Sequence, residues 1–210
     1  MEDTALWTKP IRTLNIGVIL MSFGLLVACG SAPPVPEDQY YRLQAVYATK
    51  PLANKILSGT IEVDRFVADG ITSQRAIVYS QIETPNQVRA YHYDFWIKPP
   101  TVMLRDELVS FLRASKISDA VVTPEMRVNS EYTLTGKIKH LEQVKMKAGY
   151  KTVLEIELGL RKPGTGKLLF LDTYRLENDA NGSDVAAAVV SLNTSLSTIY
   201  LEFLTSISKL

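Results

Sequence analysis

Residues 150–161 read Tyr-Lys-Thr-Val-Leu-Glu-Ile-Glu-Leu-Gly-Leu-Arg. Apolar and polar side chains alternate along this stretch, and a period of two is the signature of a half-buried β-strand. Residues 132–139 alternate in the same way, and a third apolar run, 168–176, follows the turn residues at 163–166. The three segments predict an antiparallel meander. The alternation slips at His140, where we expect a β-bulge.

A long helix is predicted after the meander, with Ser183 as its N-cap and Asp184 in its first turn, where negative charge suits the helix dipole. Its apolar residues recur at helical spacing and form one stripe. The stripe consists of Val185, Val189, Leu192, Leu196, Ile199, Phe203 and Ile207. We expect it to cover one face of the sheet. The opposite side, with Ala186, Val190 and Leu201, is a candidate surface for a neighbouring molecule.

The first half of the chain predicts further strands and one helix. Pro99 and Pro100 end a strand and open a helix that extends to about Ser115, because proline is tolerated in a first helical turn. A turn at 84–86 joins two of the strands in a hairpin. The strands are predicted at 40–43, 56–66, 75–82, 88–97 and 120–122. The fold class is therefore α+β, a mixed or antiparallel sheet with one mid-chain helix and a long C-terminal helix packed on it.

Residues 1–28 read as a secretory leader. Lys9 and Arg12 precede an apolar run, 16–28, of about 13 residues, which suits an export signal and falls short of the roughly 20 residues that span a bilayer. The run ends in Leu-Val-Ala-Cys, which resembles a bacterial lipobox. That resemblance implies cleavage between Ala28 and Cys29. It also implies a diacylglycerol on the Cys29 thiol and an N-acyl chain, typically palmitate, on the new amine. The alternative is an uncleaved anchor with an incidental cysteine.

Three parts are predicted along the chain: the lipoprotein signal peptide 1–28, a lipidated tether 29–39 and a single periplasmic domain 40–210. The tether is rich in proline, which favours an extended chain that joins no core. Gly30, rather than aspartate, follows the cysteine. Under the sorting rule of enteric lipoproteins this implies anchoring at the periplasmic face of the outer membrane.

Charge and cysteine content exclude several classes of function. Lys and Arg total 23 against 22 for Asp and Glu, so the chain has no basic footprint for nucleic acid. Cys29 is the only cysteine, and with its thiol acylated neither a disulfide nor a thiolate metal site can form.

No motif for catalysis or metal binding stands out. The 164–167 stretch, Gly-Thr-Gly-Lys, lacks the first glycine and the Ser or Thr of a phosphate-binding loop and reads as a hairpin turn. His92 and His140 are far apart in sequence and show no ligand spacing. Glu155 and Glu157 alternate on the polar side of a strand, as solvated residues do. We therefore predict no catalytic residue, no metal site and no cofactor beyond the acyl groups of Cys29.

The most unusual feature is an aromatic run before two prolines. Tyr91, Tyr93 and Trp96 precede Pro99 and Pro100. Tyrosine and tryptophan suit contact sites because they combine apolar area with a polar group. These five residues are the candidate partner-binding site. The alternative is a strand that is covered on both faces.

The combination of these motifs resembles a known family. The lipobox is followed by Tyr-Tyr-Arg-Leu at 40–43, Ile-Glu-Val at 61–63 and His-x-x-x-Trp-x-x-Pro-Pro at 92–100. This pattern is similar to the ABC-type transport auxiliary lipoproteins, the PqiC-like family. The resemblance implies a non-enzymatic outer-membrane lipoprotein that works with an ATPase, a permease and an MCE-domain protein to move lipids or other apolar compounds. It also implies docking to the MCE component, with homo-oligomerisation as a further option.

Two other functions stay open at this stage. One is an assembly lipoprotein that staples an outer-membrane machine, and the other is an envelope hydrolase whose site is built from dispersed side chains. A pocket with converging carboxylates or a Ser/His pair would favour the hydrolase.

Overall fold

The computed structural model describes residues 34–46 and 51–210, and its longest strands are those of the predicted meander. They are β7 (Tyr132–Lys145), β8 (Tyr150–Lys162) and β9 (Lys167–Ala180). β8 pairs antiparallel with both neighbours along nearly its whole length. The register shifts between Ile138 and His140, which confirms the predicted bulge. Glu37–Leu210 forms one compact unit, to which the following description applies.

The other edge of β7 is shared by three short strands that all run parallel to it. They are β2 (Thr60–Val63), β3 (Val67–Ala68) and β4 (Ala76–Gln81). β6 (Ala120–Val122) pairs with β2, β5 (Thr84–Trp96) pairs antiparallel with β4, and β1 (Gln39–Tyr41) pairs with β5. The sheet therefore has nine strands of mixed direction, as the predicted fold class requires.

Two predicted strand boundaries are wrong. Within the strand expected at 56–66 only β2 is a strand, and β3 begins after Phe66, because the chain leaves the ladder between them and Phe66 turns into the core. Its ring packs against Gly136 so closely that a Cβ at position 136 would lie 2.5 Å from it. The hairpin turn falls at residues 82–83, and 84–86 belong to β5. Proline is tolerated at 85 because the β4–β5 pairing ends at Gln81 and Thr84.

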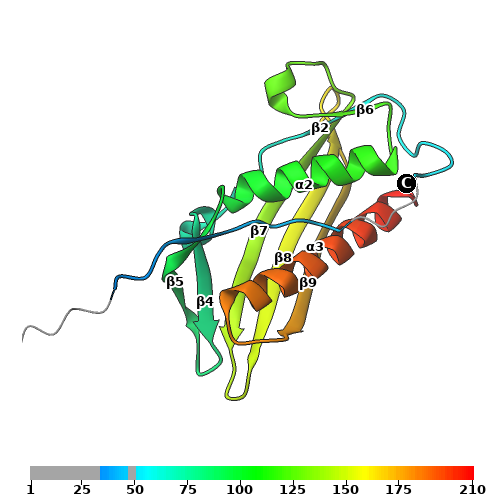
Figure 1. The fold of residues 1–210 in the computed structure, drawn as a ribbon. Helices are drawn as coiled ribbons and strands as arrows, with labels where there is room; N and C mark the ends of the chain where they lie inside the picture. The colour runs from blue at the N-terminus through cyan, green and yellow to red at the C-terminus, as the bar shows by residue number, and fades with distance from the viewer. Residues whose placement is uncertain (1–33, 47–50) are drawn as a thin grey trace, which may run out of the picture. The chain divides into compact units, whose positions relative to one another are not determined.

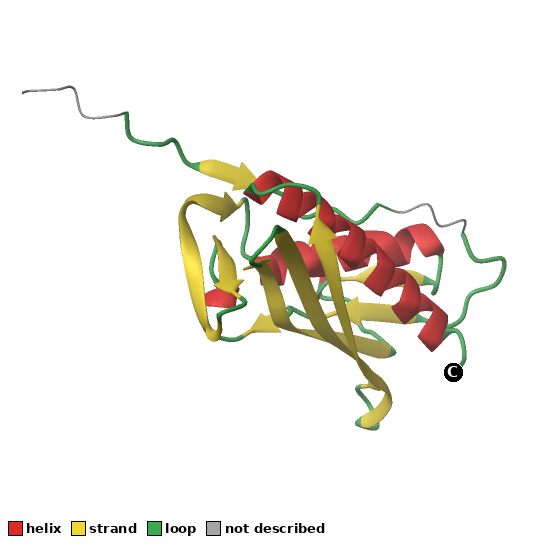
Figure 2. Ribbon diagram, turned by 90° about the horizontal axis from the view of Figure 1, so that it is seen from below, coloured by secondary structure: helices red, strands yellow, loops and turns green. Residues whose placement is uncertain are grey.

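Both helices lie on the same face of the sheet (Figures 1 and 2). α2 (Pro100–Ser115) begins at the proline pair as predicted, with Pro99 as its N-cap. α3 (Val185–Ile207) begins one residue later than expected, and Asp184 rather than Ser183 is its N-cap. The Asp184 carboxylate accepts the Ala187 N–H at 2.8 Å, a charge-assisted bond that also complements the helix dipole.

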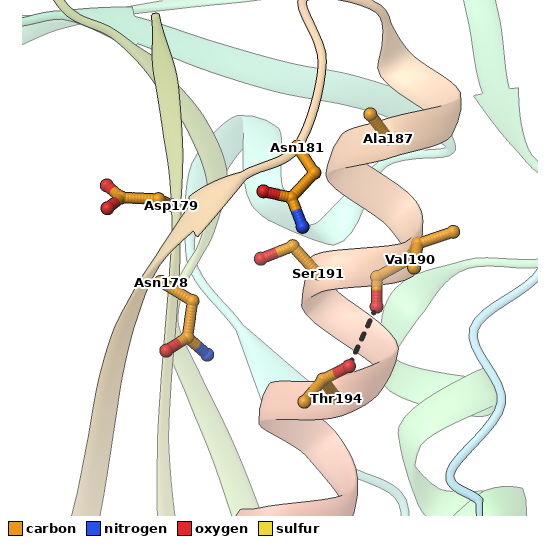
Figure 3. Close-up of a pocket in the computed structure, with 7 residues that line it drawn as sticks. All are labelled: Asn178, Asp179, Asn181, Ala187, Val190, Ser191 and Thr194. Carbon is orange, nitrogen blue, oxygen red and sulfur yellow. Dashed lines mark hydrogen bonds between the residues drawn. The ribbon is translucent and has the colours of Figure 1, made fainter.

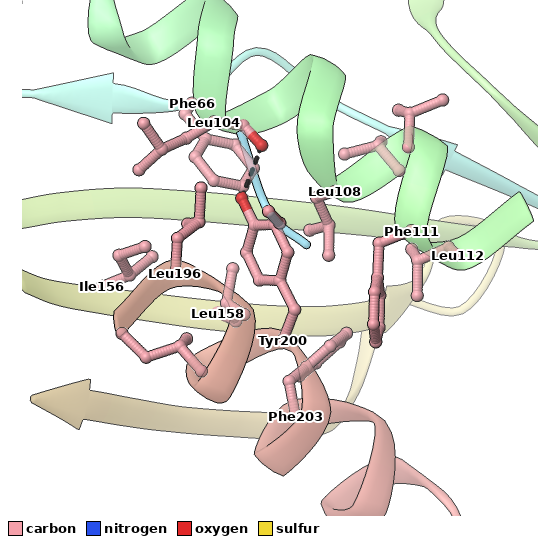
Figure 4. Packing of buried hydrophobic residues seen from close by; sticks show 14 of the residues in the cluster. Phe66, Leu104, Leu108, Phe111, Leu112, Ile156, Leu158, Leu196, Tyr200 and Phe203 are labelled. Carbon is pink, nitrogen blue, oxygen red and sulfur yellow. Dashed lines mark hydrogen bonds between the residues drawn. The ribbon is translucent and has the colours of Figure 1, made fainter. Parts of the chain in front are cut away.

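The core fills the space between the two helices and the sheet. All seven residues of the predicted α3 stripe are buried. Figure 4 shows Tyr200 of α3 reaching α2, where its hydroxyl donates to the Leu104 carbonyl at 2.6 Å. Tyr200 and Phe111 also pack with ring centroids 5.7 Å apart. The two helices are thus tied to each other as well as to the strands beneath them.

Two further short elements are 3-10 turns, η1 (Gly70–Ser73) and η2 (Pro124–Met126). No helix of the described residues covers the other face of the meander (Figures 1 and 2). That face carries paired charges, among them Arg175 with Glu155 at 2.6 Å and Lys139 with Glu157 at 3.1 Å. Such pairs are ordinary for a solvated sheet surface, as expected for these two carboxylates.

Candidate interaction surface

The segment Arg42–Val46, which we call the strap, lies between α2 and α3 directly after β1 (Figure 1). Its Leu43 and Ala45 side chains are buried. The strap has no strand partner, and side chains of the helices bind its backbone N–H groups instead. Asn193 Oδ1 accepts from Gln44 N at 2.9 Å, and Ser197 Oγ accepts from Val46 N at 2.8 Å.

A third bond anchors the strap to the other helix, since the Glu107 carboxylate of α2 accepts the Ala45 N–H at 3.0 Å. The sequence predicted a strand over 40–43, but β1 ends at Tyr41 and Leu43 belongs to the strap. The alternation of Leu43 and Ala45 with polar neighbours was the one available signal. It could not reveal that two helices, rather than a strand, supply the acceptors.

The solvent side of α3, which we call the α3 surface, carries no charge along most of its length. Its most exposed apolar residues are Val190 at 66% and Leu201 at 42%. Glu202 is the helix's one charged residue. The α3 surface consists of Ala186, Val190, Asn193, Thr194, Ser197, Thr198 and Leu201. Depletion of charge is a compositional mark of the centre of protein interfaces.

Two hollows adjoin the α3 surface. One of about 320 Å³ lies between α3 and Val46 at the end of the strap. The other, of about 310 Å³, lies between the first turns of α3 and the end of β9 (Figure 3). Val190 and Thr194 line both hollows, so the two hollows adjoin each other along the helix.

Hydrogen bonds, in addition to the buried apolar stripe, hold the first half of α3 to the sheet. The hydroxyls of Thr152 and Ser191 lie 2.7 Å apart, and the Asn178 amide donates to Ser195 Oγ at 2.8 Å. All but Asn178 of these four are buried. These bonds between buried hydroxyls fix the position of the helix relative to the sheet.

α3 is long and apolar enough to qualify as a membrane span by length and composition, and it is the one such helix of the described residues. However, 56% of the qualifying window is buried inside the domain. The length and the apolar content are therefore those of a core helix that also presents an uncharged outer side.

The five residues of the predicted partner-binding site lie partly in the core and partly on the surface. Trp96 is 1% exposed and belongs to the core, and Pro100 is buried at the start of α2. Pro99 is partly buried, while Tyr93 is 40% exposed. The five residues therefore do not form one continuous exposed patch. Trp96 is buried as the covered-strand alternative predicts, but Tyr93 on the same strand is exposed and Pro100 belongs to α2.

Tyr91 connects this run to α3. Its hydroxyl donates to the side-chain oxygen of Gln143, whose Nε2 in turn donates to the Asp184 carbonyl at 3.4 Å. Its ring packs on Tyr79 with centroids 4.5 Å apart. Burial, followed by the nearby Tyr150 and Tyr79 hydroxyls, raises the pKa of Tyr91 to about 12. Tyr91 therefore stays neutral at physiological pH and acts as a hydrogen-bond donor that positions the start of α3.

The two histidines weighed as candidate chemical groups lie on different strands, His92 on β5 and His140 on β7. No cluster of three His, Cys, Asp or Glu that could hold a metal occurs within 34–46 and 51–210. His92 is exposed, and His140 Nδ1 lies 3.1 Å from Glu142 on the charged sheet face. Ala28 and Cys29 lie outside the described residues, so their cleavage and lipidation stay predictions.

Comparison with known proteins links this geometry to a family. The family model described as "ABC-type transport auxiliary lipoprotein component" matches residues 41–201. No curated protein matches the chain in sequence. A crystal structure of a protein from Xanthomonas campestris superimposes with a TM-score of 0.69 and 20% identity, covering 81% of this chain and 96% of that one.

Two more solved structures are similar. An uncharacterized protein superimposes with a TM-score of 0.63 and 19% identity over 82% of this chain and 99% of that one. The PelC dodecamer from Paraburkholderia phytofirmans reaches a TM-score of only 0.40 at 16% identity, over 71% and 93% of the two chains. At these identities the first two likenesses establish the fold, and the third is too loose to carry an argument.

Proposed function

This chain belongs to the ABC-type transport auxiliary lipoprotein family, and we propose that it docks an MCE-domain protein of such a transporter. An auxiliary component of this family is a lipoprotein of the cell envelope that associates with an ABC transport system. In the finer proposal, acyl groups on Cys29 hold the domain at the periplasmic face of the outer membrane. The transporter then moves lipids or other apolar compounds, and this protein adds no catalytic step.

The observation that carries the docking proposal is the α3 surface. A protein partner that covers the α3 surface would remove Val190 and Leu201 from water. It would not bury an unpaired charge, and burying such a charge is the costly step in forming an interface. The strap supports the same assignment, because its bonds to Asn193 and Ser197 hold that side of α3 in one arrangement before any partner arrives. A pre-organised surface loses less entropy on binding.

The test is co-purification from native membranes in mild detergent with the full-length protein. Val190→Glu and Leu201→Glu each place a charge on the α3 surface. Leu171→Glu is the matched control, because Leu171 is an equally apolar residue on β9 that is 56% exposed and lies away from α3. We expect the wild type and the control to recover the MCE-domain protein and its permease, and the two α3 variants to lose them.

The outcomes separate the competing functions. If the wild type recovers no MCE-domain protein, the proposal fails. Recovery of an outer-membrane barrel instead would establish the assembly-lipoprotein alternative. Cys29→Ser tests the anchor separately, since the proposal expects this variant to leave the membrane fraction while its domain remains folded.

A further inference from the structure

A separate hollow of about 380 Å³ lies at the end of the sheet where β8 turns into β9. Its buried side is apolar and includes Leu57 and Tyr132, which are 7% and 8% exposed. Its outer side includes Leu168 at 55% and Leu210 at 61%, two large apolar residues left in water. The volume lies within the roughly 300–1,000 Å³ of small-molecule sites.

Two lysines complete the lining. Lys162 and Lys167 stand directly opposite each other in the β8–β9 register. Like charges in this position repel each other and weaken a strand pair. Neither side chain takes part in any ion pair of the described residues, whereas Lys162 Nζ lies 5.5 Å from the centre of the Tyr132 ring. An anion between the two ammonium groups would turn this repulsion into attraction.

The apolar lining and the paired cations together specify one chemical class of ligand. We infer that the hollow binds a single anionic amphiphile, whose acyl chain contacts Leu168 and Leu210 and whose acidic head group lies on Lys162 and Lys167. A free inorganic anion would use the lysines and leave both leucines exposed, whereas an uncharged chain would leave the lysines unpaired. The inference deepens the proposed function, on which it rests for lipid as the cargo.

The test is photo-crosslinking of the full-length protein in growing cells. The photoreactive residue p-benzoylphenylalanine replaces Leu168, and the matched control carries it at Leu171, an equally exposed leucine of the same strand outside the hollow. After irradiation, the increase in intact mass reports the attached molecule, and the unirradiated sample cancels any acyl groups already on the chain. A second probe at Leu210 covers the case in which the bulky ring at 168 fills the hollow.

We expect a lipid adduct at 168 or 210 and none at 171. A phosphate-containing adduct identifies a phospholipid, and an adduct without phosphate identifies a fatty acid. Replacing both lysines with glutamine should lower the adduct yield about tenfold, while the paired arginine variant should keep it. A matched glutamine pair at Lys145 and Lys147, which are exposed near the β7–β8 connection, should change nothing.

The inference is overturned if lipid attaches equally at 168 and 171, which would mean general membrane contact. It is also overturned if neither 168 nor 210 gives a lipid adduct, or if the glutamine pair leaves the yield unchanged. The co-purification experiment does not depend on these residues. Loss of the adduct with the partner still recovered would therefore reject the lipid site and leave the docking proposal intact.

Discussion

Truncating Leu196 to alanine tests whether α3 is held by its apolar stripe. Leu196 is fully buried among the side chains that pack between α3 and the sheet (Figure 4). The matched control is Leu201→Ala in the same helix, at a residue that is 42% exposed. Both changes alter helix propensity equally, so their difference in unfolding free energy isolates the contribution of burial.

The size of the effect follows from what the truncation removes. Loss of about three buried carbon atoms at roughly 0.8 kcal/mol each accounts for about 2.4 kcal/mol of transfer free energy. The cavity that remains brings the total to about 3 kcal/mol, inside the range of roughly 2–5 kcal/mol for buried Leu→Ala changes. For Leu201→Ala we expect less than about 1 kcal/mol, as for other surface substitutions.

Urea and thermal unfolding followed by tryptophan fluorescence provide the assay. Trp96 is 1% exposed and therefore reports loss of the core. The expected free-energy difference corresponds to a Tm lower by about 6–12 °C for Leu196→Ala in a domain of this size. If the two variants fell within about 1 kcal/mol of each other, α3 would not be held by its apolar stripe, and the reasoning about its two sides would be wrong.

Two further predictions concern packing and pH. Gly136→Ala places a methyl group against the Phe66 ring and should lower the free energy of unfolding by about 1–3 kcal/mol in urea. Gly164→Ala is the control, because a Cβ there would have no atom within 4 Å, and its free energy of unfolding should stay within about 0.5 kcal/mol of the wild type. Hydrogen bonds from Thr123 and then Arg105 lower the pKa of Glu125 to about 2 from 4.5. Because the folded-state pKa is depressed, this contribution to stability is present above pH 4.5 and lost as the pH falls towards 2. Stability curves of the wild type and Glu125→Gln should therefore converge over that interval, and parallel curves would contradict the assignment.

Much of the second half of the fold could be predicted because its signals are local. The alternation along β8 fixes which side chains face the helices, since a one-residue slip would expose Leu154, Ile156 and Leu158. The helical spacing of the α3 stripe determined its buried side in the same way. The expected bulge was visible because the alternation itself shifts phase at His140.

The errors occurred where long-range packing overrides a local pattern. The segment 56–66 has the composition of one strand, yet Phe66 leaves the ladder because a glycine 70 residues later in the sequence leaves room for its ring. Trp96 has the character of an interface residue, but it is 1% exposed and belongs to the core cluster, most of whose members lie far from it in sequence. The strap's acceptors, Asn193 and Ser197, lie about 150 residues downstream of the N–H groups they bind.

The sequence by itself determined the fold class and the family, and it predicts the leader with Cys29, because each of these depends on patterns within short stretches of chain. Only the tertiary structure decided which surfaces are available for binding. The strap beside the uncharged side of α3, and the apolar hollow beside the lysine pair, arise where segments distant in sequence meet. Helical spacing alone predicted that Val190 and Leu201 lie on the outer side of α3. It could not reveal the strap beside that side or the hollow beside the lysines, because both depend on the assembled packing.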